Sequence, residues 1–319
     1  MIRSFMFVPA DSERKLEKSL ASASDALIFD LEDSVATSRK AEARSCLHRF
    51  LLQHRGRIDK HVYVRVNDLT SGMTVNDLAA VMQHRPDGIV LPKSISGEDV
   101  RCLSCYLDVF DAVNSRTGSP TRILPIVTET ASSLFELGSY KNASPRLMGL
   151  MWGAEDLSAD IGATRRKSSG RWTGAIAHAR SLCLIAAANA GVPAIDAISA
   201  EIADLRVVES EALEAKQDGF AAKAAIHPSQ VFPINDVFTP SDEELRWAHR
   251  VISAFNDGSG VATLDGQMLD RPHMRLAERL LAACSGQQID VAHQRPRTFA
   301  DENINATDAP HNRPVSGVR

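Results

Sequence analysis

The sequence predicts an α/β fold, a (β/α)8 TIM barrel with a C-terminal helical extension, on two observations. Eight short apolar runs alternate with helical segments as far as Pro228, and charged or polar residues follow most of these runs. In such a barrel, the loops after the strands gather on one face and carry the chemistry. An open doubly wound sheet is the alternative, but the sequence contains neither a GxGxxG nor a P-loop motif.

The expected strands are short runs of apolar and often β-branched residues, a composition typical of strands buried on both faces. They cover residues 5–8, 26–29, 62–66, 88–91, 123–127, 147–152, 194–198 and 222–226.

Helical segments are expected between these runs and after the last one. Asp11-Ser12 can cap the first helix, and Ser241 can cap the last helix of the barrel. Gly191 can end the helix over about 173–190. The first expected helix follows Asp11-Ser12 and ends at about residue 23. The others cover about 39–53, 77–83, 98–114, 132–140, 173–190, 204–218 and 241–256.

Beyond a barrel domain of residues 1–257, we expect an extension over 258–285 and a polar tail over 286–319. The extension begins with a polar connector, 258–266, and continues as an amphipathic helix, 272–283, that starts with proline. The tail lacks apolar periodicity and is predicted to be disordered.

The composition indicates an ordinary soluble protein of 319 residues, 44% hydrophobic, with a net charge of −4. There is no basic run to bind nucleic acid, no apolar run of about 20 residues to span a bilayer, and no signal-peptide pattern at the N-terminus. The cysteines are odd in number and scattered, which predicts reduced thiols in the cytoplasm; they are Cys46, Cys102, Cys105, Cys183 and Cys284.

Two acids anchor the predicted site. Glu129 follows the run 123–127 and Asp156 follows the run 147–152, with one short helix between them. A strand–helix–strand unit makes the two strands parallel neighbours, so both carboxylates emerge at the same edge. Two carboxylates with open positions beside them suit Mg2+, which also binds substrate oxygens. The alternative is that both acids are solvated turn residues or N-caps.

Other reactive side chains recur at the ends of the expected strands, in greater number than capping requires, which favours an enzyme. They include Asp30, Glu32, Asp33, Arg65, Asn67, Lys93 and His227.

Seven motifs resemble, in order, the citrate lyase β-subunit-like family, which includes malyl-CoA and citramalyl-CoA lyases. The motifs read FMFVPADSERKLEKSLASASDALIFDLEDSV, VYVRVN, GIVLPKS, PIVTET, GLMWGAEDLSADIG, KAAIHPSQV and GQMLDRP. The resemblance covers about residues 2–284. The resemblance implies a TIM barrel, often a homotrimer, that cleaves or forms a carbon–carbon bond in a 3-hydroxyacyl thioester with Mg2+, or with Mn2+ in its place. The related sugar-acid aldolases carry a histidine where this sequence has Asp33, so that branch ranks lower.

The resemblance also implies roles for individual residues. Glu129 and Asp156 would bind the metal, Arg65 would grip the keto-acid carboxylate, and Glu32 and Asp33 would support the metal's water shell and that arginine. Asp270 would act as acid/base in a neighbouring subunit's site. Gly153, Ala154 and Lys93 are expected to contact the substrate; Lys223, Arg14 and Lys15 are the candidates for contact with CoA.

Alternatives remain open for several of these residues and for His227. Glu32 and Asp33 could form a structural ion pair with Lys93, and Asp270 could simply cap the helix that follows. Arg14 and Lys15 fit a solvated helix face better than a phosphate site. His227 is expected to organise the last loop, with a part in the chemistry as the alternative.

The function expected from the sequence is a cytoplasmic, Mg2+-dependent lyase, a homotrimer or hexamer, that converts citramalyl-CoA or malyl-CoA to acetyl-CoA and a 2-oxo acid. One alternative is a citrate lyase β-subunit acting on a carrier-bound citryl thioester. A catalytically silent barrel used as a scaffold is the alternative from another class.

Overall fold

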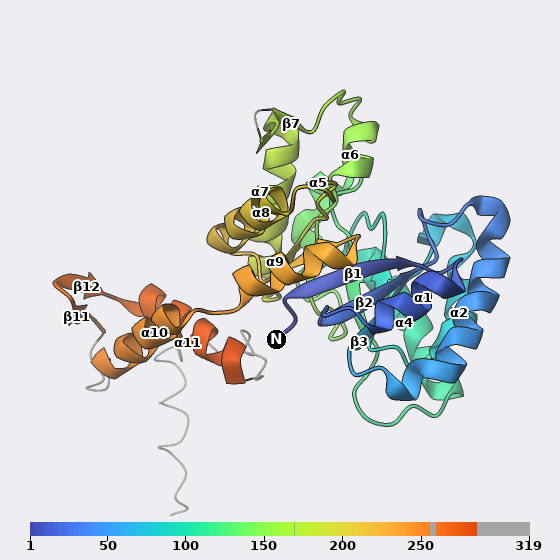
Figure 1. Ribbon diagram of the computed structural model, residues 1–319, viewed down its shortest axis with the longest axis horizontal. Coiled ribbons are helices and arrows are strands. Elements are labelled where there is room, and N and C mark those ends of the chain that lie inside the picture. The colour runs from blue at the N-terminus through green and yellow to red at the C-terminus, as the bar shows by residue number, and fades with distance from the viewer. Residues whose placement is uncertain (169, 256–259, 286–319) are drawn as a thin grey trace, which may run out of the picture. The chain divides into compact units, whose positions relative to one another are not determined.

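Eight parallel strands form the centre of the computed structural model, which describes residues 1–168, 170–255 and 260–285 (Figure 1). In chain order they are β1 (Ser4–Pro9), β2 (Ala26–Asp30), β3 (His61–Arg65), β4 (Gly88–Leu91), β5 (Arg122–Pro125), β6 (Leu150–Met151), β9 (Ala194–Asp196) and β10 (Ala222–Ala225).

The sheet closes into a barrel. Its strands are ordered β5-β4-β3-β2-β1-β10-β9-β6, and two isolated parallel bridges, Ile123 with Leu147 and Ile126 with Met151, join β5 to β6. The predicted (β/α)8 barrel is therefore confirmed, with each of the eight expected strands present.

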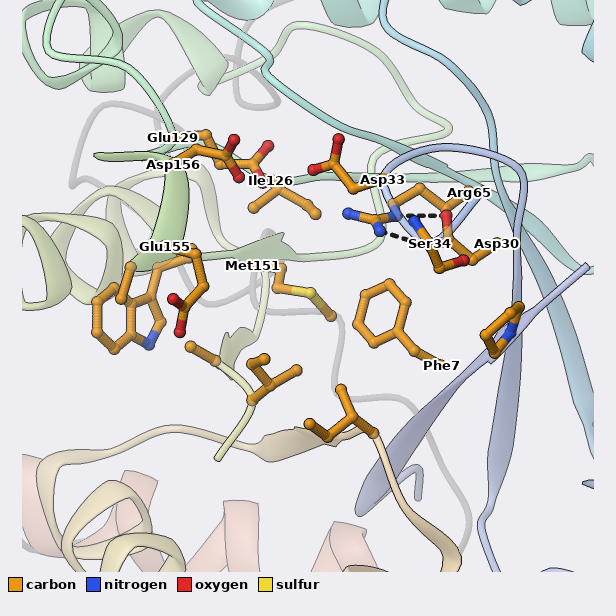
Figure 2. A pocket seen from close by; sticks show the side chains of 17 residues that line it. Phe7, Asp30, Asp33, Ser34, Arg65, Ile126, Glu129, Met151, Glu155 and Asp156 are labelled. Carbon is orange, nitrogen blue, oxygen red and sulfur yellow. Dashed lines mark hydrogen bonds and ion pairs between the residues drawn. The ribbon is translucent and has the colours of Figure 1, made fainter. Parts of the chain in front are cut away.

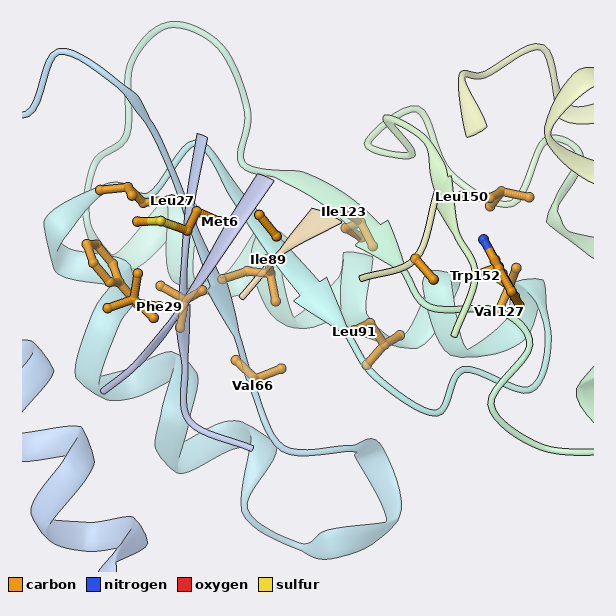
Figure 3. Packing of buried hydrophobic residues seen from close by; sticks show 14 of the residues in the cluster. Met6, Leu27, Phe29, Val66, Ile89, Leu91, Ile123, Val127, Leu150 and Trp152 are labelled. Carbon is orange, nitrogen blue, oxygen red and sulfur yellow. The ribbon is translucent and has the colours of Figure 1, made fainter. Parts of the chain in front are cut away.

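Side chains alternate along the strands between two apolar layers. Phe5, Ile28 and Tyr63 belong to a cluster inside the barrel, whereas Met6 and Leu27 pack in the cluster between the strands and the helices (Figure 3). All of β2 is buried. Because inward residues recur at every second position, the last inward residues of β2 and β3 are Asp30 and Arg65.

The expected helices are present. Ser96 caps one of them with a capping box, and Gly191 ends another in the left-handed conformation at φ 73°. The helices are α1 (Glu13–Leu20), α2 (Lys40–His54), α3 (Thr74–Val81), α4 (Gly97–Val113), α5 (Ser133–Glu136), α7 (Gly174–Ala190) and α8 (Leu205–Asp218), with 3-10 turns η1 (Thr37–Arg39), η2 (Arg55–Arg57), η3 (Leu69–Ser71), η4 (Met82–His84) and η5 (Leu137–Tyr140).

Several elements were not predicted. Helix α9 (Pro228–Phe238) follows β10, although Pro233 lies inside it; proline is usually a reason to exclude a helix. The loop after β6 forms the short helix α6 (Glu155–Asp160) and a small hairpin of β7 (Lys167–Ser168) and β8 (Arg171–Trp172).

The C-terminal extension has a small core of its own. Helix α10 (Asp242–Ala254), the hairpin of β11 (Ala262–Leu264) and β12 (Gln267–Leu269), and helix α11 (Arg271–Ser285) meet in a cluster. The predicted polar connector 258–266 is wrong where described, because β11 begins within it. Asp265 and Gly266 both have positive φ, as the two-residue turn of a hairpin requires. The predicted tail, 286–319, lies outside the described residues.

No helix in the described ranges is both long enough and apolar enough to cross a membrane. The predicted division into barrel, extension and tail remains a prediction.

Candidate active site

A cavity opens at the carboxyl ends of the barrel strands. Its wall brings together side chains from β1, β2, β3 and the loops after β5 and β6 (Figure 2). Of the residues predicted from the sequence to act in the site, six line it: Asp33, Arg65, Glu129, Gly153, Ala154 and Asp156. Glu32 and Lys93 lie directly behind this wall, in contact with Arg65 and Asp156.

Arg65 is held by a carboxylate of the neighbouring strand. Its Nε and Nη2 donate to the two oxygens of Asp30 at 2.7 and 2.6 Å, a two-point fork across the register pair Asp30–Arg65. Asp30 also accepts from the backbone N–H groups of Glu32 and Ser34. Burial alone would lower the pKa of Arg65, but the charge and hydrogen bonds of Asp30, together with the charges of Glu32 and Glu129, outweigh burial and raise that pKa.

The guanidinium still faces the cavity. Its Nη1 lies 2.9 Å from Glu32 Oε2, its Cζ lies 4.9 Å from the centre of the Phe7 ring, and the Asp30 fork leaves further N–H groups unused. Asp30 thus fixes the plane of Arg65, so that the remaining N–H groups can meet a substrate carboxylate. The sequence placed Asp30 on the rim without this role, since the pairing depends on strand register.

Lys93 forms the ion pairs that the sequence left as an alternative. Its Nζ contacts Glu32 Oε1, lies 3.1 Å from Asp33 Oδ2 and lies 3.7 Å from Asp156 Oδ1. Burial would lower the pKa of Lys93, but the hydrogen bond to Glu32 and the nearby acids raise it, so the ammonium is charged. Glu32, only 4% exposed, has its pKa raised by burial despite Arg65 and Lys93.

Glu129 is a deeply buried carboxyl group of the site. Its side chain is 4% exposed, and Oε2 accepts a hydrogen bond from the Lys93 backbone N–H at 2.5 Å. Burial raises its pKa to about 8, with the charge of Asp156 adding to the rise, while the Lys93 N–H and Arg65 oppose it. A buried carboxyl with this pKa is one whose ionised form lacks a sufficient counter-charge.

Asp156 completes the pair from the first turn of α6. Its side chain is 35% exposed and lines the same cavity as Glu129. Figure 2 shows the two carboxyl groups near each other. Within the described ranges, no group of three or more His, Cys, Asp or Glu side chains could by itself hold a metal. Two carboxylates with room beside them fit a hard cation that keeps other positions for water and substrate oxygens, as Mg2+ does. The donor set therefore fits the predicted metal.

Gly153 allows the two loops to approach each other closely. A Cβ on Gly153 would lie 2.9 Å from Glu129 Cγ and 3.2 Å from Ile126 Cγ2, closer than packed carbon atoms tolerate. The backbone between β6 and Asp156 is thus in contact with Glu129. Gly153 and Ala154 line the cavity, although their predicted contact with substrate remains a prediction.

Lys223, predicted to meet CoA, lies in the interior. Its side chain is 1% exposed, and its Nζ donates to Asp196 Oδ2 at 2.6 Å and to the Ala197 carbonyl at 2.8 Å. Asp196 also accepts from Trp152 Nε1 at 2.7 Å and from Arg180 Nε at 3.1 Å. An ammonium enclosed in this way is not placed to meet a CoA phosphate, and the structure gives that role no support.

The remaining predicted residues lie away from the cavity wall. Arg14 and Lys15 are exposed on α1, as a solvated helix face requires. Asp270 precedes α11 and is half exposed, with Oδ1 2.7 Å from His273 Nδ1. Its carbonyl accepts from the backbone N–H groups of His273 and Met274, so within one chain it begins a helix.

His227 organises the loop after β10, as expected. Its Nδ1 accepts from the Ser229 backbone N–H, and Gln230 Oε1 accepts from the His227 N–H, which forms a capping box at the start of α9. The imidazole thereby fixes the entry to a helix that the sequence did not reveal.

The chain matches the family model described as HpcH/HpaI aldolase/citrate lyase over residues 3–228. It is 33% identical over 278 residues to a citrate lyase subunit beta-like protein of Mycobacterium tuberculosis, covering 87% of this chain and 93% of that protein. A (3S)-malyl-CoA thioesterase of Cereibacter sphaeroides is 32% identical, with 88% and 93% covered. The mitochondrial citramalyl-CoA lyase of Rattus norvegicus is 31% identical, with 88% and 85% covered.

The fold is also similar to that of a solved relative. The crystal structure of CitE from Mycobacterium tuberculosis in complex with magnesium, acetoacetate and coenzyme A superposes with a TM-score of 0.73 at 32% identity. The match covers 89% of this chain and 98% of that one.

Proposed function

The chain belongs to the HpcH/HpaI aldolase/citrate lyase family, and from this we propose that it is a Mg2+-dependent carbon–carbon lyase acting on a 3-hydroxyacyl-CoA of the citramalyl-CoA or malyl-CoA type. The products would be acetyl-CoA and a 2-oxo acid. One observation carries the proposal: Glu129 and Asp156 line one cavity with Arg65, so that a site for a cation adjoins a site for a carboxylate.

Glu129 and Asp156 would hold the metal. When bound, Mg2+ acts as a Lewis acid and template for the oxygens of the 2-oxo acid. Magnesium occurs with acetoacetate and coenzyme A in the solved relative, which supports this cofactor.

Arg65 would orient the substrate for cleavage. Its unused N–H groups can bind the carboxylate of the keto-acid half, while Asp30 and Glu32 hold the guanidinium in place. Fixing that half aligns the carbon–carbon bond that must break, which is the advantage of a rigid two-point contact.

The reaction needs a base and then an acid. The 3-hydroxyl proton leaves, the bond between the second and third carbons breaks, and its electron pair goes to the carbon next to the thioester. That carbon then takes up a proton to give acetyl-CoA. The cavity acids have other engagements: Asp30 is paired with Arg65, Asp33 with Lys93 and Glu155 with Arg166, and Glu129 and Asp156 would hold the metal. We propose Asp270 of a second copy as the proton carrier.

The test is an assay of purified protein with Mg2+ against malyl-, citramalyl- and citryl-CoA, with the Glu129→Gln variant as control. We expect acetyl-CoA and a 2-oxo acid from at least one substrate, and a loss of at least 100-fold in the variant, about what a polar contact to a reacting group supplies. Equal activity of the variant would contradict the proposed site. Co-purification with an acyl carrier protein would favour the citrate lyase β-subunit. A protein that neither turns over any of these substrates nor binds metal would instead be the silent scaffold.

A second candidate is hydrolysis of the same thioester, because one relative is named a malyl-CoA thioesterase. The same assay separates the two activities: a lyase releases acetyl-CoA, whereas a thioesterase releases free CoA and the hydroxy acid.

A further inference from the structure

Lys93 touches both acids of the proposed metal pair. Its backbone N–H donates to Glu129 Oε2, and its ammonium lies 3.7 Å from Asp156 Oδ1. The same ammonium contacts Glu32 and lies 3.1 Å from Asp33. One residue therefore connects the metal pair with the two acids that follow β2.

The backbone of Lys93 is fixed, whereas its ammonium lies at the end of a long side chain within reach of several acids. Lys93 adopts φ 51°, in the left-handed region that residues other than glycine rarely occupy. The hydrogen bond to Glu129 holds this conformation. The side chain is 28% exposed, and its flexible carbon stem lets the ammonium change partners without moving the loop.

In the part of the chain that the structure describes, Lys93 supplies the positive charge closest to Asp156. Among the described residues, the ammonium of Lys93 is the cationic group within 4 Å of the Asp156 carboxylate. Arg65, the other nearby cation, is already committed to Asp30 and Glu32. In the protein without metal, Lys93 thus supplies the positive charge that Asp156 faces.

We propose that Lys93 is a tethered counter-cation of the metal pair, which a divalent cation must displace from Asp156 in order to bind. The inference rests on the proposed metal role of Glu129 and Asp156 and adds a competitor for it. A second cation cannot share the carboxylate at contact distance without strong repulsion. Displaced, the ammonium keeps Glu32 and Asp33 as partners, so it is not left unpaired.

The test is calorimetric titration of the metal-free protein with MgCl2, which needs no substrate. In Lys93→Met the competitor is gone, and we expect Mg2+ to bind about tenfold more tightly. Lys93→Arg keeps a cation in place and should bind close to the parent. The matched control is Lys141→Met, the same change at an exposed lysine that does not line the cavity. Thermal unfolding confirms that each variant is folded.

Salt separates displacement from a general effect of charge. The gain in Lys93→Met should persist at about 0.5 M KCl, where exposed charges more than a few ångströms apart are screened. A gain that vanishes there, or a Lys93→Met variant that binds Mg2+ no more tightly than the parent, would overturn the inference.

The two proposals fail differently. If the parent does not bind Mg2+, or Glu129→Gln binds it equally well, the proposed metal site is wrong. If the parent binds and Glu129→Gln does not, but Lys93→Met shows no gain, only the role of Lys93 is wrong.

Discussion

Glu129 combines deep burial with a carboxyl group that ionises only at high pH. Its pKa is raised from 4.5 to about 8, chiefly by burial. Between these values the unfolded chain releases the proton while the folded chain keeps it. The folded state therefore loses stability as the pH rises through this window, on the order of a few kcal/mol in total.

This predicts a pH-dependent stability that one substitution removes. In metal-free protein, the melting temperature of the parent should fall relative to that of Glu129→Gln between about pH 5 and about pH 8. Parallel curves for the two proteins would contradict the raised pKa. Added Mg2+ should raise the melting temperature of the parent most at the upper end of this pH range and leave the melting temperature of Glu129→Gln unchanged. Thermal melts at several pH values measure both effects.

A second prediction concerns the close contact at Gly153. The methyl group of Gly153→Ala would meet Glu129 Cγ and Ile126, so Glu129 must shift. We expect affinity for Mg2+ to fall about tenfold or more, while the chain still folds with a loss of roughly 1–3 kcal/mol. Titration with Mg2+ and chemical denaturation measure the two effects. Gly138→Ala, where the added Cβ meets nothing within 4 Å, is the matched control.

Three pairs of charged residues show what the sequence could and could not predict at this scale. Glu129 and Asp156 were predicted because each lies within a few residues of the end of an apolar run. Asp30 with Arg65 and Asp196 with Lys223 are opposite each other in neighbouring strands, at a register that only the folded sheet defines. Lys223 was accordingly assigned to CoA, although its strand directs it to Asp196.

At the scale of elements, Asp196 joins three parts of the barrel wall. It accepts from Lys223 on β10, Arg180 on α7 and Trp152 after β6, and it is 2% exposed. Burial would raise its pKa, but Lys223 and Arg180 outweigh burial and lower it, so Asp196 is ionised. Trp152 lines the cavity, so this network supports the site.

We therefore predict that Asp196→Ala is strongly destabilising. Removing the acid leaves two buried cations without their partner, which costs about 3–5 kcal/mol in buried ion pairs. Denaturant unfolding measures the loss. Asp108→Ala, which removes an exposed partner of Arg146, serves as control and should cost less than about 1 kcal/mol. Equal losses in the two variants would show that the network carries no special weight.

Elements were predictable where apolar pattern decided them and were missed where turn chemistry did. The barrel strands are short runs of mostly apolar residues, so each was found. The hairpin of β11 and β12 depends on Asp265-Gly266, a pair that favours the required turn, whereas the polar composition of 258–266 predicts a connector. Helix α9 was not predicted; Pro233 lies inside it, and the capping box of His227 and Gln230 begins it.

At the scale of the whole molecule, Asp270 poses a question of assembly. It lies in the extension, outside the cavity wall, half exposed and paired with His273. If it serves a second copy, each site needs acids from two chains.

This predicts complementation. Asp270→Asn and Glu129→Gln should each be inactive alone, because each site then lacks its proton carrier or its metal ligand. Unfolding and refolding them together should produce mixed oligomers in which some sites hold an intact set. We expect activity to return to roughly one quarter of the parent level for a random mixture of two chains. No recovery, with mixed oligomers verified by tagged chains, would place Asp270 outside a shared site.

The closure of the barrel is its least supported part. Strands β5 and β6 are joined by two isolated bridges, whereas other neighbours share continuous ladders. Glu129 follows β5 and Asp156 follows β6, so the two acids stand on either side of this seam. A metal ion bound by both acids would link the two sides of this seam. Binding of the cofactor would therefore also stabilise the closed barrel. Amide hydrogen exchange around residues 123–127 and 147–152 should then slow on adding Mg2+ more than anywhere else in the barrel.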